Sequence, residues 1–442
     1  MSLTITNPKN LGVTTWLPSC NDITYRIAST ESTQNGFYFL VEVFINNAKV
    51  VTLRKYPVTG LPTELNIKDI VNAYISSVFS VTNAVGTNWH TGSDFVKFHI
   101  QATEWYGGES YDSVTSIDMY AFDASAPFEI LKTTGQQTFY RNFTYDTYYN
   151  RKGRPMGYHQ ALNINPDDLF DTLQKPYILY EWTKEYSYPL VRGDKRDLSM
   201  FCGENISRNT EITCLIAYGF DEYGEYIKKA VKTIATANDN VNRHWTNYIV
   251  TGGTETNWTM ALNGALETVT DLSDCKYIYY CFAKSYEANL RVETDASQGV
   301  LFEICDCNES YSVLYKSFEG GWHNIQCNRR VTEETNINTI TRKNVSPYLY
   351  TANTRLTTAV YVEANGTLVL HTGWLNDALN EEVQDMLRSP LIYIQHFKDG
   401  SIEYIPVTLA NANYTTEEKN SVNLFSYTLT FAESYSKNTI IQ

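Results

Sequence analysis

The chain has 442 residues, of which 43% are hydrophobic and only 19% charged, with a formal net charge of −14 at pH 7. At about 150 residues per domain, this length suggests roughly three domains. The acidic balance excludes a broadly basic nucleic-acid-binding protein, and the many Tyr, Phe and Trp residues exclude a disordered chain. Because no apolar run reaches the ~18 residues of a membrane-spanning helix, we expect no insertion into a membrane.

Residues 1–130 are predicted to form an N-terminal module of two β-hairpins with a helix between them. Alternating apolar residues over 37–45 predict a strand that turns at Asn46-Asn47 and returns along the following residues. Apolar residues spaced three and four apart from Ile67 to Val78 predict the helix. The second hairpin is expected over 95–105 and 114–122, across Gly107-Gly108.

Residues 131–345 are predicted to be a central β-rich region. A short helix is expected at Asn165-Pro166, because proline suits the first helical position. Residues 332–344 are interpreted as an exposed connection. Strands are predicted over residues 211–220, 226–234, 276–282, 299–304 and 311–316.

A basic, aromatic arm is predicted near residues 139–154. It alternates tyrosines with cations on an otherwise acidic protein, which suits docking against an acidic neighbouring copy. The candidate interface residues are Tyr140, Arg141, Tyr145, Tyr148, Tyr149, Arg151 and Arg154.

Residues 346–442 are predicted to repeat the hairpin–helix–hairpin order of the N-terminal module. Asn365-Gly366 and Asp399-Gly400 are strong signals for hairpin turns, and an amphipathic helix is expected between them, ending at Ser389-Pro390. The predicted fold class is therefore mainly β with a few short helices (α+β), built as several antiparallel β-sandwich-like modules.

The sequence offers little catalytic chemistry. It contains no phosphate-binding, dinucleotide-binding, zinc-protease or nucleophile-elbow motif, so we expect a protein that is not an enzyme and that needs no cofactor. A weak alternative is a zinc site built from Cys305, Cys307, His323 and Cys327. The competing interpretation of these residues is that they are reduced, buried structural side chains.

Several stretches resemble one family of virion structural proteins, from tailed phages of Bacteroidetes-type hosts. They are Cys20-Asn-Asp-Ile-Thr-Tyr25 with the hairpin that follows it, Leu190-Val-Arg-Gly-Asp-Lys-Arg-Asp-Leu-Ser-Met-Phe201, Tyr311-Ser-Val-Leu-Tyr-Lys-Ser-Phe-Glu-Gly-Gly-Trp-His323, and Leu368-Val-Leu-His-Thr-Gly-Trp374. His323 departs from the family, which tends to have Asp at that position. None of these motifs is catalytic, so no active-site residue is carried over.

The resemblance implies a tail component, such as a baseplate, tail-tip or tail-ring protein, that is assembled in the host cytoplasm. Its expected partners are copies of itself, arranged in a ring, and other virion proteins. Two alternatives stay open: a tail fibre or tip protein that binds a host receptor or surface glycan, and a tail-borne glycan hydrolase that uses a pair of carboxylates.

Overall fold

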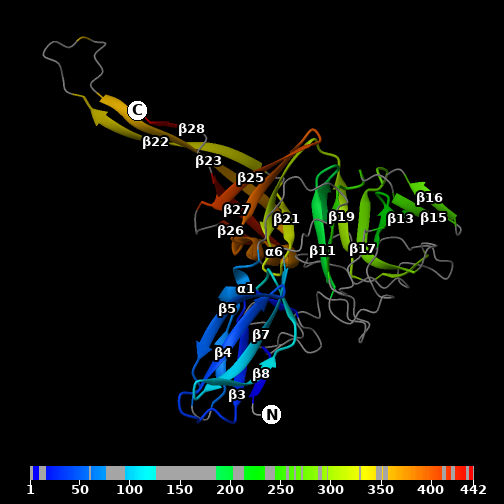
Figure 1. Cartoon of the computed structure of the whole chain (residues 1–442). Coiled ribbons are helices and arrows are strands. Elements are labelled where there is room, and N and C mark those ends of the chain that lie inside the picture. Colours follow the sequence, from blue (N-terminus) through cyan, green and yellow to red (C-terminus); the bar gives the residue numbers. More distant parts are fainter. Residues whose placement is uncertain are drawn as a thin grey trace. The chain divides into compact units, whose positions relative to one another are not determined.

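The computed structural model describes residues 3–8, 16–58, 61–75, 95–125, 186–202, 214–233, 244–254, 258–262, 265–269, 272–286, 291–295, 297–327, 330–344, 351, 357–410, 415–419, 424–434 and 438–441. These residues are mainly in antiparallel β-sheets with a few short helices, which confirms the predicted fold class. The chain divides into two compact units. The first comprises Met1–Tyr188, Lys195–Glu303 and Ser317–Gly321, and the second Pro189–Asp194, Ile304–Lys316 and Trp322–Gln442. Figure 1 labels the helices and strands along the chain.

The N-terminal part of the first unit contains two sheets. The smaller has the strand order β1-β3-β6 and the larger β2-β9-β7-β4-β5, with β8 also paired to β7. Helix α1 (Lys68–Asn72) is shorter than predicted, and the end of the predicted helix lies outside the described residues. The strands are β1 (Leu3–Thr6), β2 (Trp16–Pro18), β3 (Thr24–Ser29), β4 (Tyr38–Ile45), β5 (Ala48–Lys55), β6 (Thr63–Asn66), β7 (Phe95–Tyr106), β8 (Glu109–Thr115) and β9 (Met119–Phe122).

The alternation predicted for this region is seen directly in the burial of β4 and β7. On each strand every second side chain is buried, so the core contains Phe39, Val41, Phe98 and Ile100 while their neighbours face outward. The predicted turn between β4 and β5 is confirmed, since Asn46 and Asn47 have φ angles of 51° and 66°. Positive φ at both central residues is the signature of a type I′ hairpin turn.

The remainder of the first unit confirms the central strands predicted between 211 and 304. Its main sheet contains the order β19-β17-β12-β13-β15-β16, with β18 paired to β17, and β11 pairs separately with β14. Tyr218, Tyr279 and Leu301 pack in its core. The strands are β11 (Arg196–Cys202), β12 (Cys214–Phe220), β13 (Tyr226–Thr233), β14 (His244–Val250), β15 (Trp258–Leu262), β16 (Ala265–Val269), β17 (Tyr277–Tyr286), β18 (Arg291–Asp295) and β19 (Val300–Cys305). The helix predicted at Asn165-Pro166 lies outside the described residues.

The second unit is built on one sheet with the order β21-β20-β24-β25-β27-β23-β22, in which β26 also pairs with β27 and β28 with β23. Helix α6 (Asp377–Leu387) begins at the N-cap Asn376, whose side chain accepts from the backbone N–H of Leu379 (3.0 Å). The strands are β20 (Glu309–Lys316), β21 (Trp322–Gln326), β22 (Arg330–Lys343), β23 (Thr357–Leu375), β24 (Ile392–Lys398), β25 (Ser401–Leu409), β26 (Thr415–Lys419), β27 (Leu424–Glu433) and β28 (Asn438–Ile441), and β10 (Tyr188–Val191) ends in this unit.

Two hairpin predictions for the C-terminal region have opposite outcomes. The turn at Asp399-Gly400 is confirmed, since both residues have positive φ and β24 pairs with β25 across them. The turn at Asn365-Gly366 is wrong, because β23 continues through both residues. Asn365 and Gly366 pair with Asn336 and Thr335 of β22, so the two flanks of the dipeptide pair with other strands and not with each other.

The segment 332–344 is a strand, β22, and not a connection. This also corrects the predicted module boundary at 345/346, because β22 and β23 pair along most of their length in one sheet. Strands β20 and β21 belong to that sheet as well. The boundary was misplaced because β22 is polar on both faces and lacks the alternation that predicts a half-buried strand.

Candidate functional site

The interface candidates of the basic, aromatic arm, Tyr140, Arg141, Tyr145, Tyr148, Tyr149, Arg151 and Arg154, lie outside the described residues. Their role in docking therefore stays a prediction. The described residues contain buried polar clusters, one ion-pair network and two exposed surfaces.

The weak zinc site is wrong. His323 is buried on β21 and Cys327 is buried in the core just beyond that strand, whereas Cys307 is exposed. Four residues along an extended chain span about 13 Å, so His323 and Cys327 cannot share one ion at ligand distances of ~2 Å. Across the described residues, no three His, Cys, Asp or Glu side chains converge as metal ligands would.

His323 instead belongs to a buried cluster that joins two strands and a helix. The Tyr315 hydroxyl lies 3.1 Å from His323 Nδ1 and donates to the backbone carbonyl of Glu382 in α6 (3.2 Å). His323 Nε2 lies 4.0 Å from the Glu382 carboxylate. All three side chains are at most 1% exposed, so this cluster fixes α6 to the sheet and does not face a substrate in solution.

A second buried group, which we call the Asp194 cluster, lies within the second unit. It holds the segment Pro189–Asp194 of that unit against the unit's own sheet. Asp194 accepts from Gln395 Nε2 (2.5 Å) and from the Ser310 hydroxyl (3.2 Å). Gln395 in turn accepts from Asn324 Nδ2 (3.0 Å). A buried carboxyl group needs such donors because its desolvation is otherwise uncompensated. The motif beginning at Leu190 therefore has a structural use here.

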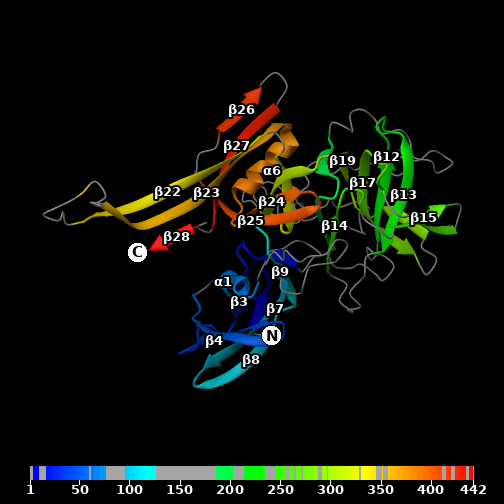
Figure 2. The ribbon, with the colours of Figure 1, turned by 90° about the horizontal axis from the view of Figure 1, so that it is seen from above.

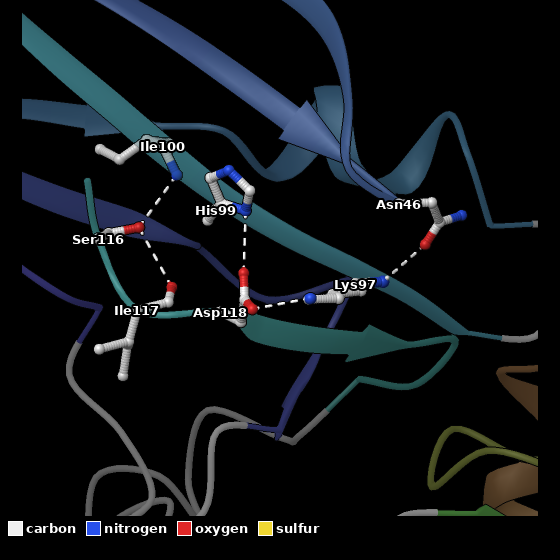
Figure 3. A network of polar contacts seen from close by, with 7 residues as sticks. All are labelled: Asn46, Lys97, His99, Ile100, Ser116, Ile117 and Asp118. Atoms are coloured by element: carbon white, nitrogen blue, oxygen red, sulfur yellow. Dashed lines mark hydrogen bonds and ion pairs between the residues drawn. The ribbon is translucent and has the colours of Figure 1, made fainter. Parts of the chain in front are cut away.

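The loop between β8 and β9 is held by a network of polar contacts around Asp118 (Figure 3). Asp118 contacts Lys97 Nζ (2.7 Å) and His99 Nδ1 (2.9 Å), both on β7. The Ser116 hydroxyl accepts from the backbone N–H of Ile100 (3.0 Å). Desolvation of the Asp118 carboxyl opposes its ionisation, but the contacts with Lys97 and His99 outweigh it and hold the pKa of Asp118 below its usual value.

This lowered pKa predicts a contribution to stability that disappears in acid. A carboxyl whose pKa is lower in the folded than in the unfolded state stabilises the fold above its unfolded pKa of about 4, and the contribution is lost as the pH falls through the folded pKa. We expect Asp118→Asn to cost about 0.2–1 kcal/mol at pH 7, as for other partly exposed ion pairs. The difference between wild type and variant in urea unfolding should shrink toward zero by about pH 2. A difference that does not change with pH would contradict this assignment.

Asp197 is a buried carboxyl group on β11. Burial raises the pKa of Asp197 to about 7, although Arg196 and Lys195 lower it. A carboxyl that titrates near neutrality could act as a general acid, but glycoside hydrolysis needs a second carboxyl about 5–10 Å away. Neither β11 nor its partner β14 carries a second carboxylate residue, so this pair of strands does not supply one.

The first exposed surface is aromatic and lies on the outward face of β4 and β7. We call it the Tyr38 surface. The Tyr38 ring is stacked on that of Trp105 (centroids 6.1 Å apart), is 6.1 Å from Tyr56, and carries the Arg54 guanidinium 4.4 Å from its centroid. Tyr56 is 64% exposed. Tyr38 and Trp105 are half-buried. An exposed ring next to half-buried rings and a cation suits protein contact or stacking on a sugar.

The second exposed surface is the ribbon formed by β22 and β23, which extends beyond the other strands of its sheet (Figures 1 and 2). Every residue from Glu333 to Lys343 is exposed, including Ile337 (68%) and Ile340 (57%). The other edge of β23 pairs with β27 and β28, whereas β22 is the edge strand of the sheet among the described residues. This surface was not predicted from the sequence, although the apolar Ile337 and Ile340 within a polar run were a signal of it.

Comparison with known proteins gives no family: no protein-family model matches the sequence, and no curated protein matches it significantly. Within the part of the chain that the structure describes, no helix has the length and apolar character needed to cross a membrane.

Proposed function

We propose that the protein is a virion structural protein of a tailed phage, and that it forms part of the tail as a baseplate, tail-tip or tail-ring protein. The resemblance of four sequence stretches to such proteins supports the phage assignment. The geometry supports assembly by contact between surfaces. The edge strand β22 and the ring of Tyr56 are exposed, whereas the polar clusters of the second unit are buried.

The observation that carries assembly is the exposed ribbon. Within the described part of the chain its edge strand β22 is open on one side, and an open edge strand invites pairing with other chains. Pairing with another chain in a larger assembly would cover this open edge. A ring of identical copies would need heterologous contacts between two different surfaces, for which the Tyr38 surface and the predicted arm at 139–154 are candidates.

The proposal is tested on purified phage particles. We expect mass spectrometry to detect the protein in virions, and labelling with an antibody against it to mark the tail by electron microscopy. Light scattering on the purified protein should show a defined oligomer at high concentration. Particles that lack the protein, or that carry the label only on the head, would contradict the assignment.

The Tyr38 surface favours a second candidate function, recognition of a host receptor or surface glycan. If this function holds, Tyr56→Ala should weaken binding to host cells about 3- to 10-fold, because one stacking ring is lost. The matched control is Tyr223→Ala, since Tyr223 is similarly exposed (70%) but lies outside this surface. Wild-type protein that binds neither cells nor a glycan array would exclude this alternative and leave the structural role in place.

A further inference from the structure

Strand β22 has an unusual distribution of charge along its exposed edge. Glu333 and Glu334 lie toward its beginning, and Arg342 and Lys343 lie at its end, with only uncharged residues between them. All four side chains are exposed, and none forms an ion pair with another residue in the described part of the chain. Arg330 lies at the start of β22, ahead of this stretch, so the exposed stretch 333–343 is the part that is acidic at one end and basic at the other.

Such a strand is complementary to its own copy when the two run antiparallel. A two-fold axis perpendicular to the sheet keeps each side chain on the same face in both copies. A residue of one copy can therefore lie opposite only those residues of the other copy whose sequence numbers differ from its own by an even number. With Asn338 of the two copies facing each other, Glu334 of each copy lies opposite Arg342 of the other. Glu333 lies opposite Lys343 in the same register.

The neighbouring registers lose this match. A pairing centred on Ile337 places Glu333 opposite Thr341, and one centred on Thr339 places Lys343 opposite Thr335. Opposite charges that face each other across strands are favourable, and like charges are not. The register centred on Asn338 also makes Ile337 of the two copies diagonal neighbours on one face, where both side chains lose exposed apolar area.

The strand itself is regular enough to pair in this way. The irregularity in the β22–β23 ladder falls between Ile340 and Thr341, where the additional residue is Val360 of β23. The bulge thus bends the partner strand, and β22 keeps its alternation from Glu333 to Lys343. An edge strand points every second N–H and C=O outward, so a second strand can extend the sheet by main-chain hydrogen bonds.

We propose that β22 pairs antiparallel with β22 of a second copy of this chain, about a two-fold axis at Asn338, so that the sheets of two copies join edge to edge. This contact goes beyond the proposed function, because a ring needs contacts between two different surfaces whereas this contact uses the same surface twice. It joins copies in pairs whether or not they also belong to a ring.

Charge reversal tests the pairing without touching the core. One variant carries Glu333→Lys and Glu334→Lys, and a second carries Arg342→Glu and Lys343→Glu. In each, like charges face each other across the two-fold axis, and we expect the apparent Kd for pairing to rise about 10- to 100-fold relative to wild type. Because all four residues are exposed, circular dichroism and the unfolding midpoint should stay at the wild-type values.

Mixing the two variants distinguishes this register from repulsion that depends only on net charge. An equimolar mixture of differently tagged variants should form a mixed pair of near wild-type affinity, since every facing pair is again of opposite sign. The variant with all four reversals should pair with itself in the same way. Light scattering and native mass spectrometry measure both.

Three results would overturn the proposal: a wild-type chain that stays unpaired at the highest concentration reached, single-end variants that pair as wild type does, or a mixture that stays apart. None of them affects whether the protein is found in virions, so failure of this contact and failure of the proposed function are told apart. Pairing that persists in every variant would show that the copies meet through another surface.

Discussion

Replacing Gln395 by leucine should lower the free energy of unfolding of the second unit by about 2–3 kcal/mol, the cost of removing a buried donor to a carboxyl group. Gln395 is 2% exposed, donates to Asp194 and accepts from Asn324. Leucine has a similar volume but can do neither. The loss should appear as a lower urea midpoint with an unchanged slope.

The matched control is Gln101→Leu, in which the amide lost is one that donates to Ser113 at the surface (2.9 Å). Water replaces that contact, so the expected cost is within about 0.5 kcal/mol. Asp194→Asn should cost less in the Gln395→Leu background than in the wild type, because the carboxyl group has already lost its donor. Equal losses for the two glutamine substitutions would show that the Asp194 cluster does not support the fold.

Gly299→Ala should be similarly costly, at about 2–3 kcal/mol, because the added methyl group overpacks a buried ring. A Cβ at Gly299 would overlap the ring of Tyr279, which is 2% exposed, and the Tyr279 hydroxyl also accepts from the backbone N–H of Gly299 (2.9 Å). The ring cannot move aside without disturbing the core of β17 and its neighbours.

Gly366→Ala is the informative comparison. There the added Cβ would meet the carboxylate of Glu433, the end of a flexible side chain. We expect a cost below about 1 kcal/mol, since that end can shift where the Tyr279 ring cannot. In a Tyr279→Leu background, Gly299→Ala should lose most of its effect. Equal costs at the two glycines, or no rescue at Tyr279, would contradict the packing described for β17 and β19.

The local elements of this fold were largely predictable. Strands β4 and β7 bury every second residue, as their alternation predicted, and Asn46, Asn47 and Asp399 adopt the positive φ that their turn types require. Helix α6 falls where the three- and four-residue spacing placed it. These features follow from neighbouring residues, because periodicity and turn conformation depend on a few positions at a time.

The errors concern pairing between distant segments. Asn365-Gly366 has the composition of a turn, yet both of its flanks find partners on β22, β27 and β28, so the chain stays extended. His323 and Cys327 were grouped with Cys305 and Cys307 as a weak candidate zinc site, but the extended chain between them holds them too far apart for one ion. The first outcome depends on pairing with distant strands, and the second on the segment being extended.

The sequence alone determined the fold class, the hairpin turns at Asn46-Asn47 and Asp399-Gly400, and the apolar faces of the strands, because these arise from interactions over a few residues. Only the tertiary structure decided that β22 is a strand, that it lies at the edge of its sheet, and that Glu333, Glu334, Arg342 and Lys343 are exposed along it. The physical reason is that β22 is held by main-chain hydrogen bonds to β23, which carry no signature in the side chains of β22 itself.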